Sequence, residues 1–254
     1  MRIAVAGGTG VVGKHVVQAA SQAGHDVVSI SRRTGVDVQT GVGLSEVLQG
    51  VEVIIDTTNV GTTNRAKATT FFTEVAGQLQ RAGAAQGVSH LVALSIVGLE
   101  RVPGFGYYQA KLAQESALLA GPLPVSIVRA TQFHEFAVQI LSRARLGPLA
   151  AVPIMRIQPV AARAVGEALV EVATGPGGAP TAEIAGPEEK DLVPLARAIV
   201  RKRQRRIVVA PLRVPGSAGK AMRTGGQLPS PAASVIGPRF EEWLAGEDLA
   251  SMFA

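Results

Sequence analysis

The sequence predicts a doubly wound, mostly parallel α/β sheet with helices on both faces, followed by a smaller and less regular C-terminal portion. Short runs rich in Val and Ile are typical of strands buried on both faces of a parallel sheet. Such runs alternate with stretches of helical pattern over residues 1–130. This alternation favours right-handed β-α-β units. In such a sheet, ligands bind beyond the carboxyl ends of the strands.

Five strands and four helices are predicted in the first half. The strands are Arg2–Ala6, Asp26–Ser31, Val51–Asp56, Val88–Ser95 and Val125–Arg129. The helices are Gly10–Ala23, Leu44–Gln49, Asn64–Gln86 and Tyr107–Leu119. Beyond residue 130 the pattern predicts helices over Ala161–Ala173, Leu192–Arg201 and Phe240–Leu244, with extended segments over Ala182–Ala185 and Ile207–Ala210. Pro211–Pro238 is rich in Gly, Pro and Ser, which predicts a long loop or lid.

Composition excludes several classes of protein. The 254 residues are 47% hydrophobic and 17% charged, which is enough apolar material for a large core and excludes disorder as the main state. The absence of cysteine excludes a disulfide scaffold, a thiolate zinc site and a cysteine nucleophile. The four histidines show no ligand spacing, so no metal is expected. No run of 18 apolar residues and no signal region are found, so we expect a cytoplasmic protein without membrane association.

A glycine-rich turn follows the first predicted strand and opens the first predicted helix. Gly8, Gly10 and Gly13 make one familiar spacing, GxGxxG, and Gly7, Gly10 and Gly13 make another, GxxGxxG. Glycine allows a tight strand-to-helix turn and lets the backbone approach a pyrophosphate. The helix N-terminus then offers unpaired N–H groups to the phosphates. The strand–turn–helix context therefore predicts a dinucleotide site, against the alternative of a purely structural turn.

The end of the second predicted strand indicates which dinucleotide is preferred. Proteins that prefer NAD usually carry an acidic residue there, which binds the ribose 2′-hydroxyl. This chain has Ser31, Arg32 and Arg33 instead. Two guanidinium groups suit a 2′-phosphate by charge and by bidentate hydrogen bonding. We therefore expect NADP(H) rather than NAD, although either arginine could be a solvated loop residue.

A tyrosine, a lysine and a serine suggest acid–base chemistry. Lys111 follows Tyr107 by four residues, which places both side chains on one face of a helix. An ammonium near a phenol favours the phenolate and makes the phenol a usable proton donor or acceptor. Ser95 ends an apolar strand, where its hydroxyl could polarise a substrate carbonyl. The alternatives are a packed aromatic and a hydroxyl that caps the backbone.

Together these features resemble the short-chain dehydrogenase/reductase superfamily. The segment Leu94–Gly98 and the run Gly106–Glu115 are similar to its atypical, NmrA-like NAD(P)H-binding branch. The resemblance covers residues 1–140 well and implies a Rossmann-type sheet. It also implies that Tyr107 is the general acid/base, that Lys111 adjusts its acidity and anchors the ribose, and that Ser95 orients the carbonyl. The chain departs from the family in its proton relay, because its only asparagines, Asn59 and Asn64, precede the helix position usual for the relay residue.

The resemblance extends the set of expected cofactor contacts. These residues are Gly7, Gly8, Thr9, Gly10, Val11, Val12, Gly13, Ser31, Arg32, Arg33, Asp56, Thr57, Thr58, Asn59, Lys111, Ala130, Thr131 and Phe133. The residues expected to contact substrate are Val97, Tyr107, Gln132, His134 and Met155. We interpret residues 1–254 as one domain, with a cofactor-binding core over 1–130 and substrate-binding segments and a lid over 131–254.

The predicted activity is hydride transfer between NADP(H) and a small carbonyl or quinone-like substrate. Two alternatives remain open, a non-catalytic dinucleotide-sensing regulator and a nucleotide-sugar epimerase or dehydratase. The resemblance implies a monomer or a homodimer. The net charge of +6 comes mainly from the second half, and five basic residues lie in Arg201–Arg206. Because no aromatic residues interleave with that run, it favours a solvated surface over nucleic-acid binding.

Overall fold

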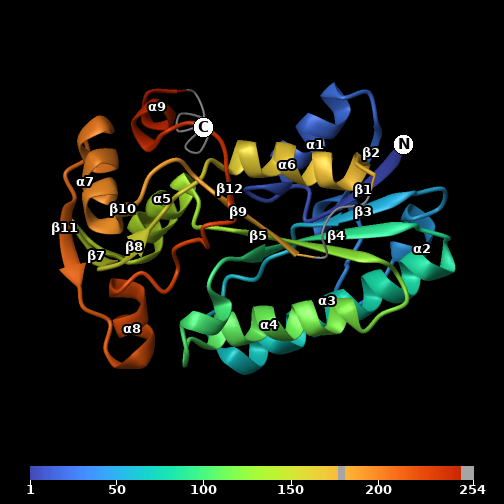
Figure 1. Cartoon of the computed structure of the whole chain (residues 1–254), viewed down its shortest axis with the longest axis horizontal. Helices are drawn as coiled ribbons and strands as arrows, with labels where there is room; N and C mark the ends of the chain where they lie inside the picture. Colours follow the sequence, from blue (N-terminus) through green and yellow to red (C-terminus); the bar gives the residue numbers. More distant parts are fainter. Residues whose placement is uncertain (177–180, 247–254) are drawn as a thin grey trace. The chain divides into compact units, whose positions relative to one another are not determined.

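The computed structural model describes residues 1–176 and 181–246, and the chain divides into two compact units (Figure 1). Unit 1 comprises Met1–Ile96, Phe105–Arg129 and Arg163–Ala182. Unit 2 comprises Val97–Gly104, Ala130–Ala162 and Glu183–Ala254. The chain therefore passes repeatedly from one unit to the other.

The predicted sheet is confirmed as a seven-stranded, mostly parallel sheet. Its strand order is β12-β9-β5-β4-β3-β1-β2. The strands are β1 (Arg2–Ala6), β2 (Asp26–Ile30), β3 (Val53–Asp56), β4 (His90–Ile96), β5 (Val125–Ala130), β9 (Thr181–Ala185) and β12 (Ser234–Val235). All four residues of β3 are buried, as are the last four of β1. This burial explains why these strands read as continuous apolar runs.

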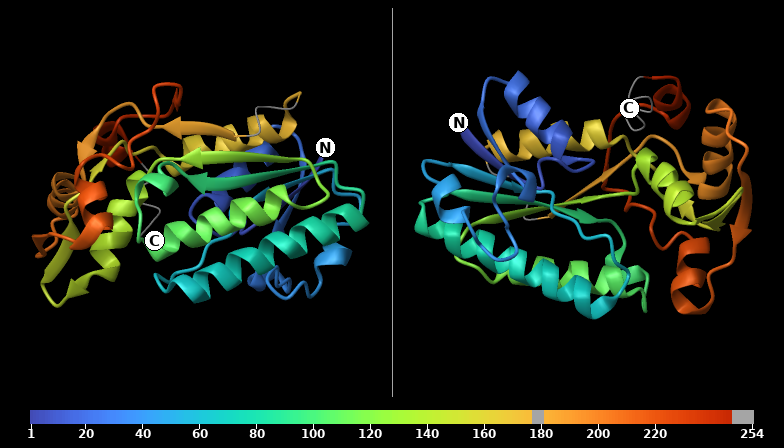
Figure 2. Two further views of the ribbon diagram at one scale, coloured as in Figure 1. Left: turned by 60° about the horizontal axis from the view of Figure 1, so that its bottom comes forward. Right: turned by 180° about the vertical axis from the view of Figure 1, so that it is seen from behind.

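Helices cover both faces of the sheet in unit 1. On one face, α3 (Arg65–Ala85) packs along α4 (Gly106–Leu119), as Figure 2 shows from two directions. On the other face lie α1 (Gly13–Gln22) and α6 (Ala162–Thr174), in contact where Gly166 fits against the backbone of His15. The short helix α2 (Leu44–Val47) and the 3-10 turn η1 (Arg32–Thr34) complete the unit. The sequence pattern predicted the five α-helices to within a few residues, whereas η1 was not predicted.

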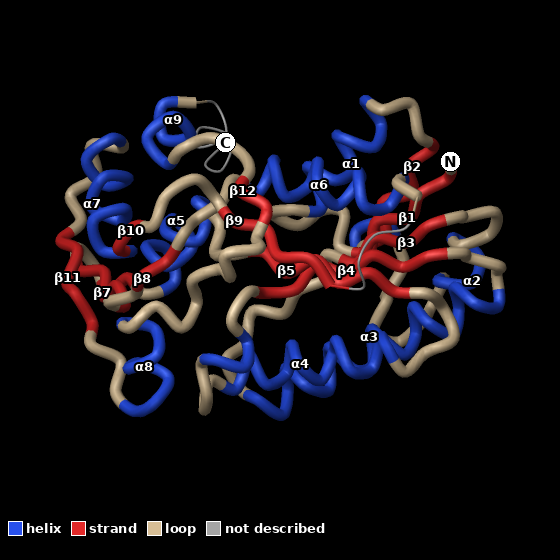
Figure 3. Tube along the Cα trace, in the orientation of Figure 1, coloured by secondary structure: helices blue, strands red, loops and turns tan. Residues whose placement is uncertain are grey.

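Unit 2 contains shorter elements, traced in Figure 3. Its helices are α5 (His134–Arg143), α7 (Leu192–Lys202), α8 (Gly216–Arg223) and α9 (Phe240–Ala245), with the 3-10 turn η2 (Leu99–Arg101). One small sheet has the order β11-β7-β6, from β6 (Arg145–Leu146), β7 (Leu149–Pro153) and β11 (Val208–Leu212). The other pairs β8 (Arg156–Ile157) with β10 (Lys190–Asp191).

One prediction for this second half was wrong, and one helix was missed. Pro211–Pro238 is not one long loop, because it contains α8 and β12. Helix α8 contains two glycines, and glycine has a low helix propensity, so the sequence does not indicate a helix there. The buried side chain of Met222 and the close approach of Gly219 to the Val214 carbonyl stabilise the helix. Helix α5 was not predicted at all. No helix in the described part of the chain is long and apolar enough to span a bilayer.

Candidate functional site

The glycine turn packs three glycines around one carbonyl. Gly7 has φ of +78°, and its carbonyl accepts a hydrogen bond from the Gly10 N–H at 2.8 Å. A Cβ at Gly13 would overlap that carbonyl, and a Cβ at Gly7 would lie 2.9 Å from the Thr57 carbonyl oxygen. Any larger side chain at either position would therefore displace the backbone. The spacing of Gly7, Gly10 and Gly13 is the one that closes the turn.

The turn leads directly into the N-terminus of α1. The ten-residue helix begins at Gly13, and Thr9 and Gly10 are exposed just before it. No side chain caps this helix start. The first turn of a helix leaves N–H groups without internal partners and carries the positive end of the helix dipole. The arrangement therefore fits a pyrophosphate bound at this end of the helix.

Three hydroxyls with inaccessible oxygens lie near the carboxyl ends of strands in the sheet. Ser31 follows β2, Thr58 follows β3 and Ser95 is the penultimate residue of β4. Their oxygens are inaccessible, but two of them have local roles, because the Thr58 side chain bonds to Asp56 and the Ser31 side chain belongs to the capping box of η1. The Ser95 oxygen has no hydrogen-bond partner within the described residues, and because buried polar atoms are normally paired, it is a position that a bound ligand could satisfy. All three lie at the carboxyl edge of the sheet in unit 1, where a dinucleotide is expected.

The loop after β3 is fixed against the glycine turn. The N–H of Thr57 and its hydroxyl both donate to the Ala6 carbonyl at 2.9 Å. The Thr58 N–H donates to Asp56 Oδ1 at 2.9 Å. Together with the close approach of Gly7 to Thr57, these bonds hold the predicted cofactor-binding residues Asp56–Asn59 next to the glycine turn.

Arg32 and Arg33 are exposed in η1, immediately after β2. The Ser31 N–H donates to Thr34 Oγ1 at 3.0 Å, which closes this turn. The nearest downstream acidic residue, Asp37, uses Oδ1 to accept from the Gln39 N–H at 2.9 Å. The end of β2 is thus basic, as the sequence predicted.

Tyr107 and Asn59 are joined by a hydrogen bond. The Tyr107 hydroxyl donates to Asn59 Oδ1 at 2.7 Å, and the Val60 N–H donates to the same oxygen at 2.7 Å. The Tyr107 ring packs edge-to-face on Phe72 of α3, with 5.7 Å between centroids. Asn59 precedes the helix position that is usual for the relay residue. In the fold, however, Tyr107 of α4 lies within hydrogen-bond distance of Asn59.

Lys111 is buried in a polar network behind this tyrosine. Its Nζ donates to the Leu94 carbonyl at 2.9 Å and to Gln114 Oε1 at 2.5 Å. Gln114 Nε2 in turn donates to Asp56 Oδ2 at 2.8 Å. Nζ also lies 4.9 Å from the centroid of Phe72, the ring that Tyr107 contacts. The predicted pair Tyr107 and Lys111 therefore shares one helix face and one aromatic neighbour.

Burial shifts the pKa values of both charged members of this network. It lowers the pKa of Lys111 to about 8, and the carboxylates of Asp56 and Glu115 partly oppose that shift. Burial raises the pKa of Asp56, against the hydrogen bonds from Thr58 and Gln114 and the charge of Lys111. With a pKa of about 8, the Lys111 side chain titrates much closer to neutral pH than an ordinary lysine does.

Two residues of this region were not predicted from the sequence. Gln114 bridges Asp56 and Lys111, and its spacing of three from Lys111 on one helix was the available signal. Glu115 forms a bidentate pair with Arg129, at 3.0 Å and 2.6 Å, which ties α4 to β5. Nothing in the local pattern identifies that partner, because the contact depends on strand order.

The residues predicted to contact substrate and the nicotinamide end lie mostly in unit 2. Several of them make internal bonds there. Thr131 Oγ1 donates to the Gln158 carbonyl at 2.6 Å, and the Val97 N–H donates to the Ala130 carbonyl at 3.0 Å. Met155 is buried, as is Gln132.

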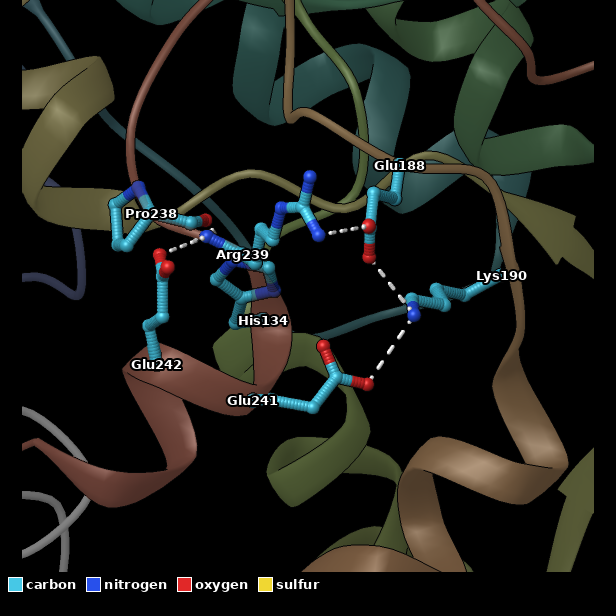
Figure 4. A network of polar contacts seen from close by, with 7 residues as sticks. All are labelled: His134, Glu188, Lys190, Pro238, Arg239, Glu241 and Glu242. Atoms are coloured by element: carbon cyan, nitrogen blue, oxygen red, sulfur yellow. Dashed lines mark hydrogen bonds and ion pairs between the residues drawn. The ribbon is translucent and has the colours of Figure 1, made fainter.

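His134 belongs to the polar network drawn in Figure 4. Its Nε2 lies 3.2 Å from the Pro238 carbonyl oxygen, and its ring packs on Phe240 and Trp243 of α9. Burial lowers its pKa to about 4, partly opposed by the bond to Pro238 and the charge of Glu241. These contacts hold the His134 ring between α5 and α9 within unit 2, and its predicted contact with substrate stays a prediction.

A mostly parallel sheet with a glycine turn between β1 and α1 defines a Rossmann-like α/β fold of the kind that binds dinucleotides. The described residues contain no cluster of three His, Cys, Asp or Glu side chains that could hold a metal ion.

Comparison with known proteins agrees with this class. Residues 3–97 match the model of the NAD dependent epimerase/dehydratase family. No curated protein matches the chain in sequence.

Solved structures resemble the whole chain. A short-chain dehydrogenase/reductase superfamily protein from Agrobacterium tumefaciens with bound NAD has a TM-score of 0.69 and 18% identity, covering 100% of this chain and 97% of that one. UDP-N-acetylglucosamine 4-epimerase from Bacillus cereus has a TM-score of 0.71 and 16% identity, covering 100% and 96%. An NADPH-dependent quinone oxidoreductase from Escherichia coli has a TM-score of 0.68 and 15% identity, covering 99% and 100%. At these identities the likeness shows the fold, and the narrower resemblance to the NmrA-like branch stays a prediction.

Proposed function

We propose that this chain is an NADP(H)-dependent oxidoreductase of the atypical short-chain type, which transfers hydride between the nicotinamide and a small carbonyl or quinone-like substrate. The observation that carries the proposal is the Tyr107 hydroxyl held 2.7 Å from Asn59 Oδ1. This bond holds a phenol at the loop after β3, in the same unit as the glycine turn and the unpaired Ser95 hydroxyl. The bound nicotinamide would supply the hydride.

The chain's own residues would supply the proton. An amide oxygen can only accept, so Asn59 keeps the hydrogen on the Tyr107 oxygen and orients it. The Val60 N–H fixes that amide by donating to the same oxygen. To act as a general acid, the Tyr107 hydroxyl would turn from Asn59 to the substrate oxygen and deliver its proton there, leaving a phenolate that solvent reprotonates. The buried Ser95 hydroxyl is available to hold that oxygen, since it has no partner in the described chain.

Cofactor binding would use the carboxyl edge of unit 1. The glycine turn and the α1 N-terminus would hold the pyrophosphate, and residues Asp56–Asn59 would line its ribose and nicotinamide side. Arg32 and Arg33 would bind a 2′-phosphate, which favours NADP(H) over NAD. Substrate recognition by Val97, Gln132, His134 and Met155 is part of the same proposal.

A second candidate is a nucleotide-sugar epimerase or dehydratase. The family match over residues 3–97 and the fold shared with the Bacillus cereus epimerase favour it. Such an enzyme would use the same tyrosine but would retain its dinucleotide through turnover. The two candidates differ in whether NADPH is consumed.

The test is NADPH oxidation with a panel of aromatic carbonyls and quinones, followed by nicotinamide absorbance. Tyr107→Phe keeps the ring on Phe72 but removes the proton donor, so kcat should fall by about 100-fold or more with cofactor Kd unchanged. The neighbouring Tyr108 is buried and offers a matched control. Tyr108→Phe should retain the wild-type kcat.

Each other outcome selects a different function. Full turnover by Tyr107→Phe would exclude its acid–base role. Conversion of a UDP-sugar without net NADPH oxidation would favour the second candidate. Dinucleotide binding with no turnover of either kind would favour a sensing regulator.

A further inference from the structure

The small sheet of unit 2 has one buried and one exposed face. In β7, Ala150 and Val152 are fully buried, and the alternate residues of Leu149–Pro153 are not. In β11, Val209 is buried between exposed or half-buried neighbours. Helices α5 and α7 pack on these strands. The buried residues therefore face helices, and the alternate residues form an outer face (Figure 3 shows β7 and β11).

The outer face is entirely apolar. Strand register aligns Val208 with Leu149 and Leu146 with Leu149, so three large side chains form one row. Two further rows join Ala210 to Ala151 and Leu212 to Pro153. The outer face thus consists of Leu146, Leu149, Ala151, Pro153, Val208, Ala210 and Leu212. None of these side chains offers a hydrogen-bonding group.

Exposure of large apolar side chains is concentrated here. Leu146 is 80% exposed and Val208 is 64% exposed. The other large apolar side chains exposed on or beside this sheet are Leu149, Ile154 and Leu212, and only Met1, Val42, Leu119 and Val235 are exposed elsewhere in the described chain. Contiguous exposure of this kind marks an interaction surface rather than ordinary surface composition.

The segments that build and flank this sheet are strongly basic. Residues 143–153 contain two basic residues and residues 197–213 contain seven, and neither segment contains an acidic residue. Arg145 lies on β6, the run Arg201–Arg206 leads into β11, and Arg213 follows β11. The outer face is therefore apolar and is flanked by segments that carry basic residues and no acidic residue, and this charge favours an anionic occupant.

We propose that the outer face docks on an anionic lipid surface. A second copy of this chain is disfavoured, because a two-fold contact would bring the same basic residues together. An acidic protein would need hydrogen-bonding or aromatic anchors, and the outer face provides none. An acyl–headgroup boundary requires only apolar side chains, while guanidinium groups pair with lipid phosphates. Binding at the surface needs no membrane-spanning helix, and the proposal does not depend on the proposed enzymatic activity.

The test is cosedimentation of the whole protein with two kinds of vesicle. One contains phosphatidylcholine alone, and the other contains phosphatidylcholine with a minor share of phosphatidylglycerol. The protein should pellet with the anionic vesicles only, and added salt should release it. No preference for the anionic vesicles would overturn the proposal.

Paired variants separate the face from general surface effects. Leu146→Ser combined with Val208→Thr should weaken vesicle binding by about tenfold, as should Arg205→Glu, because apolar contact and each basic residue contribute on this scale. Leu119→Ser and Arg81→Glu alter exposed residues of unit 1 and should bind as the wild type does. Equal losses in the control variants would overturn the assignment to this face. The assignment would also be overturned if ultracentrifugation showed that the wild type is a dimer and that the Leu146 and Val208 double variant is a monomer.

Discussion

At the residue scale, the chemistry of unit 1 depends on how a buried lysine and a buried aspartate are compensated. Neither Lys111 nor Asp56 reaches solvent, and Gln114 donates to one and accepts from the other. Removing one partner of a buried polar pair costs more than the pair contributes, because the remaining group stays desolvated. Gln114 is therefore a residue that unit 1 needs in order to fold with both charges inside.

Replacing Gln114 with leucine should test this compensation. Gln114→Leu leaves Asp56 and Lys111 each short of one hydrogen bond, and should lower the free energy of unfolding by about 2–4 kcal/mol. Urea unfolding at neutral pH measures this loss. Gln109→Leu on the same helix alters a half-buried glutamine and should cost less than about 1 kcal/mol. A loss at Gln114 no larger than at Gln109 would show that the bridge adds nothing to stability.

Local patterns identified the types of chemical group but not their partners. The glycine turn, the arginines after β2 and the spacing of Tyr107 and Lys111 are local features, and the structure places them in one unit. The bond between Tyr107 and Asn59 joins residues 48 positions apart, and the pair Glu115–Arg129 depends on the placement of α4 beside β5. Such contacts are determined by strand order, which periodicity does not encode.

At the element scale, the strands and helices that are most buried were predicted most closely from the sequence. Strands β1 and β3 are buried on both faces, so their Val and Ile runs stand out and their bounds were predicted closely. Helix α8 has two glycines and is held by tertiary contacts, and α5 follows β5 after only three residues. Strands of two residues, such as β6, β8 and β10, are too short to show any period.

Helices α5 and α9 should give unit 2 an acid-sensitive contact. His134 begins α5 and packs on two rings of α9, and burial lowers its pKa from 6.5 to about 4. The folded protein therefore binds fewer protons than the unfolded chain between pH 6.5 and 4. Its free energy of unfolding should fall through this window by up to about 3 kcal/mol, with no contribution from this group above it.

Comparison of variants isolates this contribution from that of the carboxylates. His134→Leu removes the titrating group, so its unfolding free energy should vary less with pH between 6.5 and 4 than that of the wild type. Parallel slopes for the wild type and His134→Leu in urea titrations would contradict a buried neutral histidine.

At the scale of the whole molecule, the two units are built from interleaved segments. Unit 1 takes three segments of the chain and unit 2 takes three others. Neither unit is a continuous piece of sequence, so truncation at residue 130 would remove α6 from unit 1. We therefore expect the chain to unfold in one cooperative transition, which is the condition for interpreting a single Tm.

That single transition gives the most direct test of cofactor preference. A ligand that binds only the folded state at about 100 times its Kd adds about 2.7 kcal/mol, which raises the Tm of a protein of this size by roughly 5–10 °C. NADP and NADPH should produce such a shift, and NAD and NADH a smaller one. Arg32→Ala combined with Arg33→Ala should reduce the NADP shift to the size of the NAD shift, because the 2′-phosphate loses its guanidinium partners. Arg201→Ala combined with Arg205→Ala removes the same charge from unit 2 and should leave both shifts unchanged. Equal reductions of the NADP and NAD shifts by the Arg32 and Arg33 variant would mean that these arginines do not distinguish the two cofactors. A second unfolding transition whose Tm no dinucleotide changes would mean that the two units unfold separately.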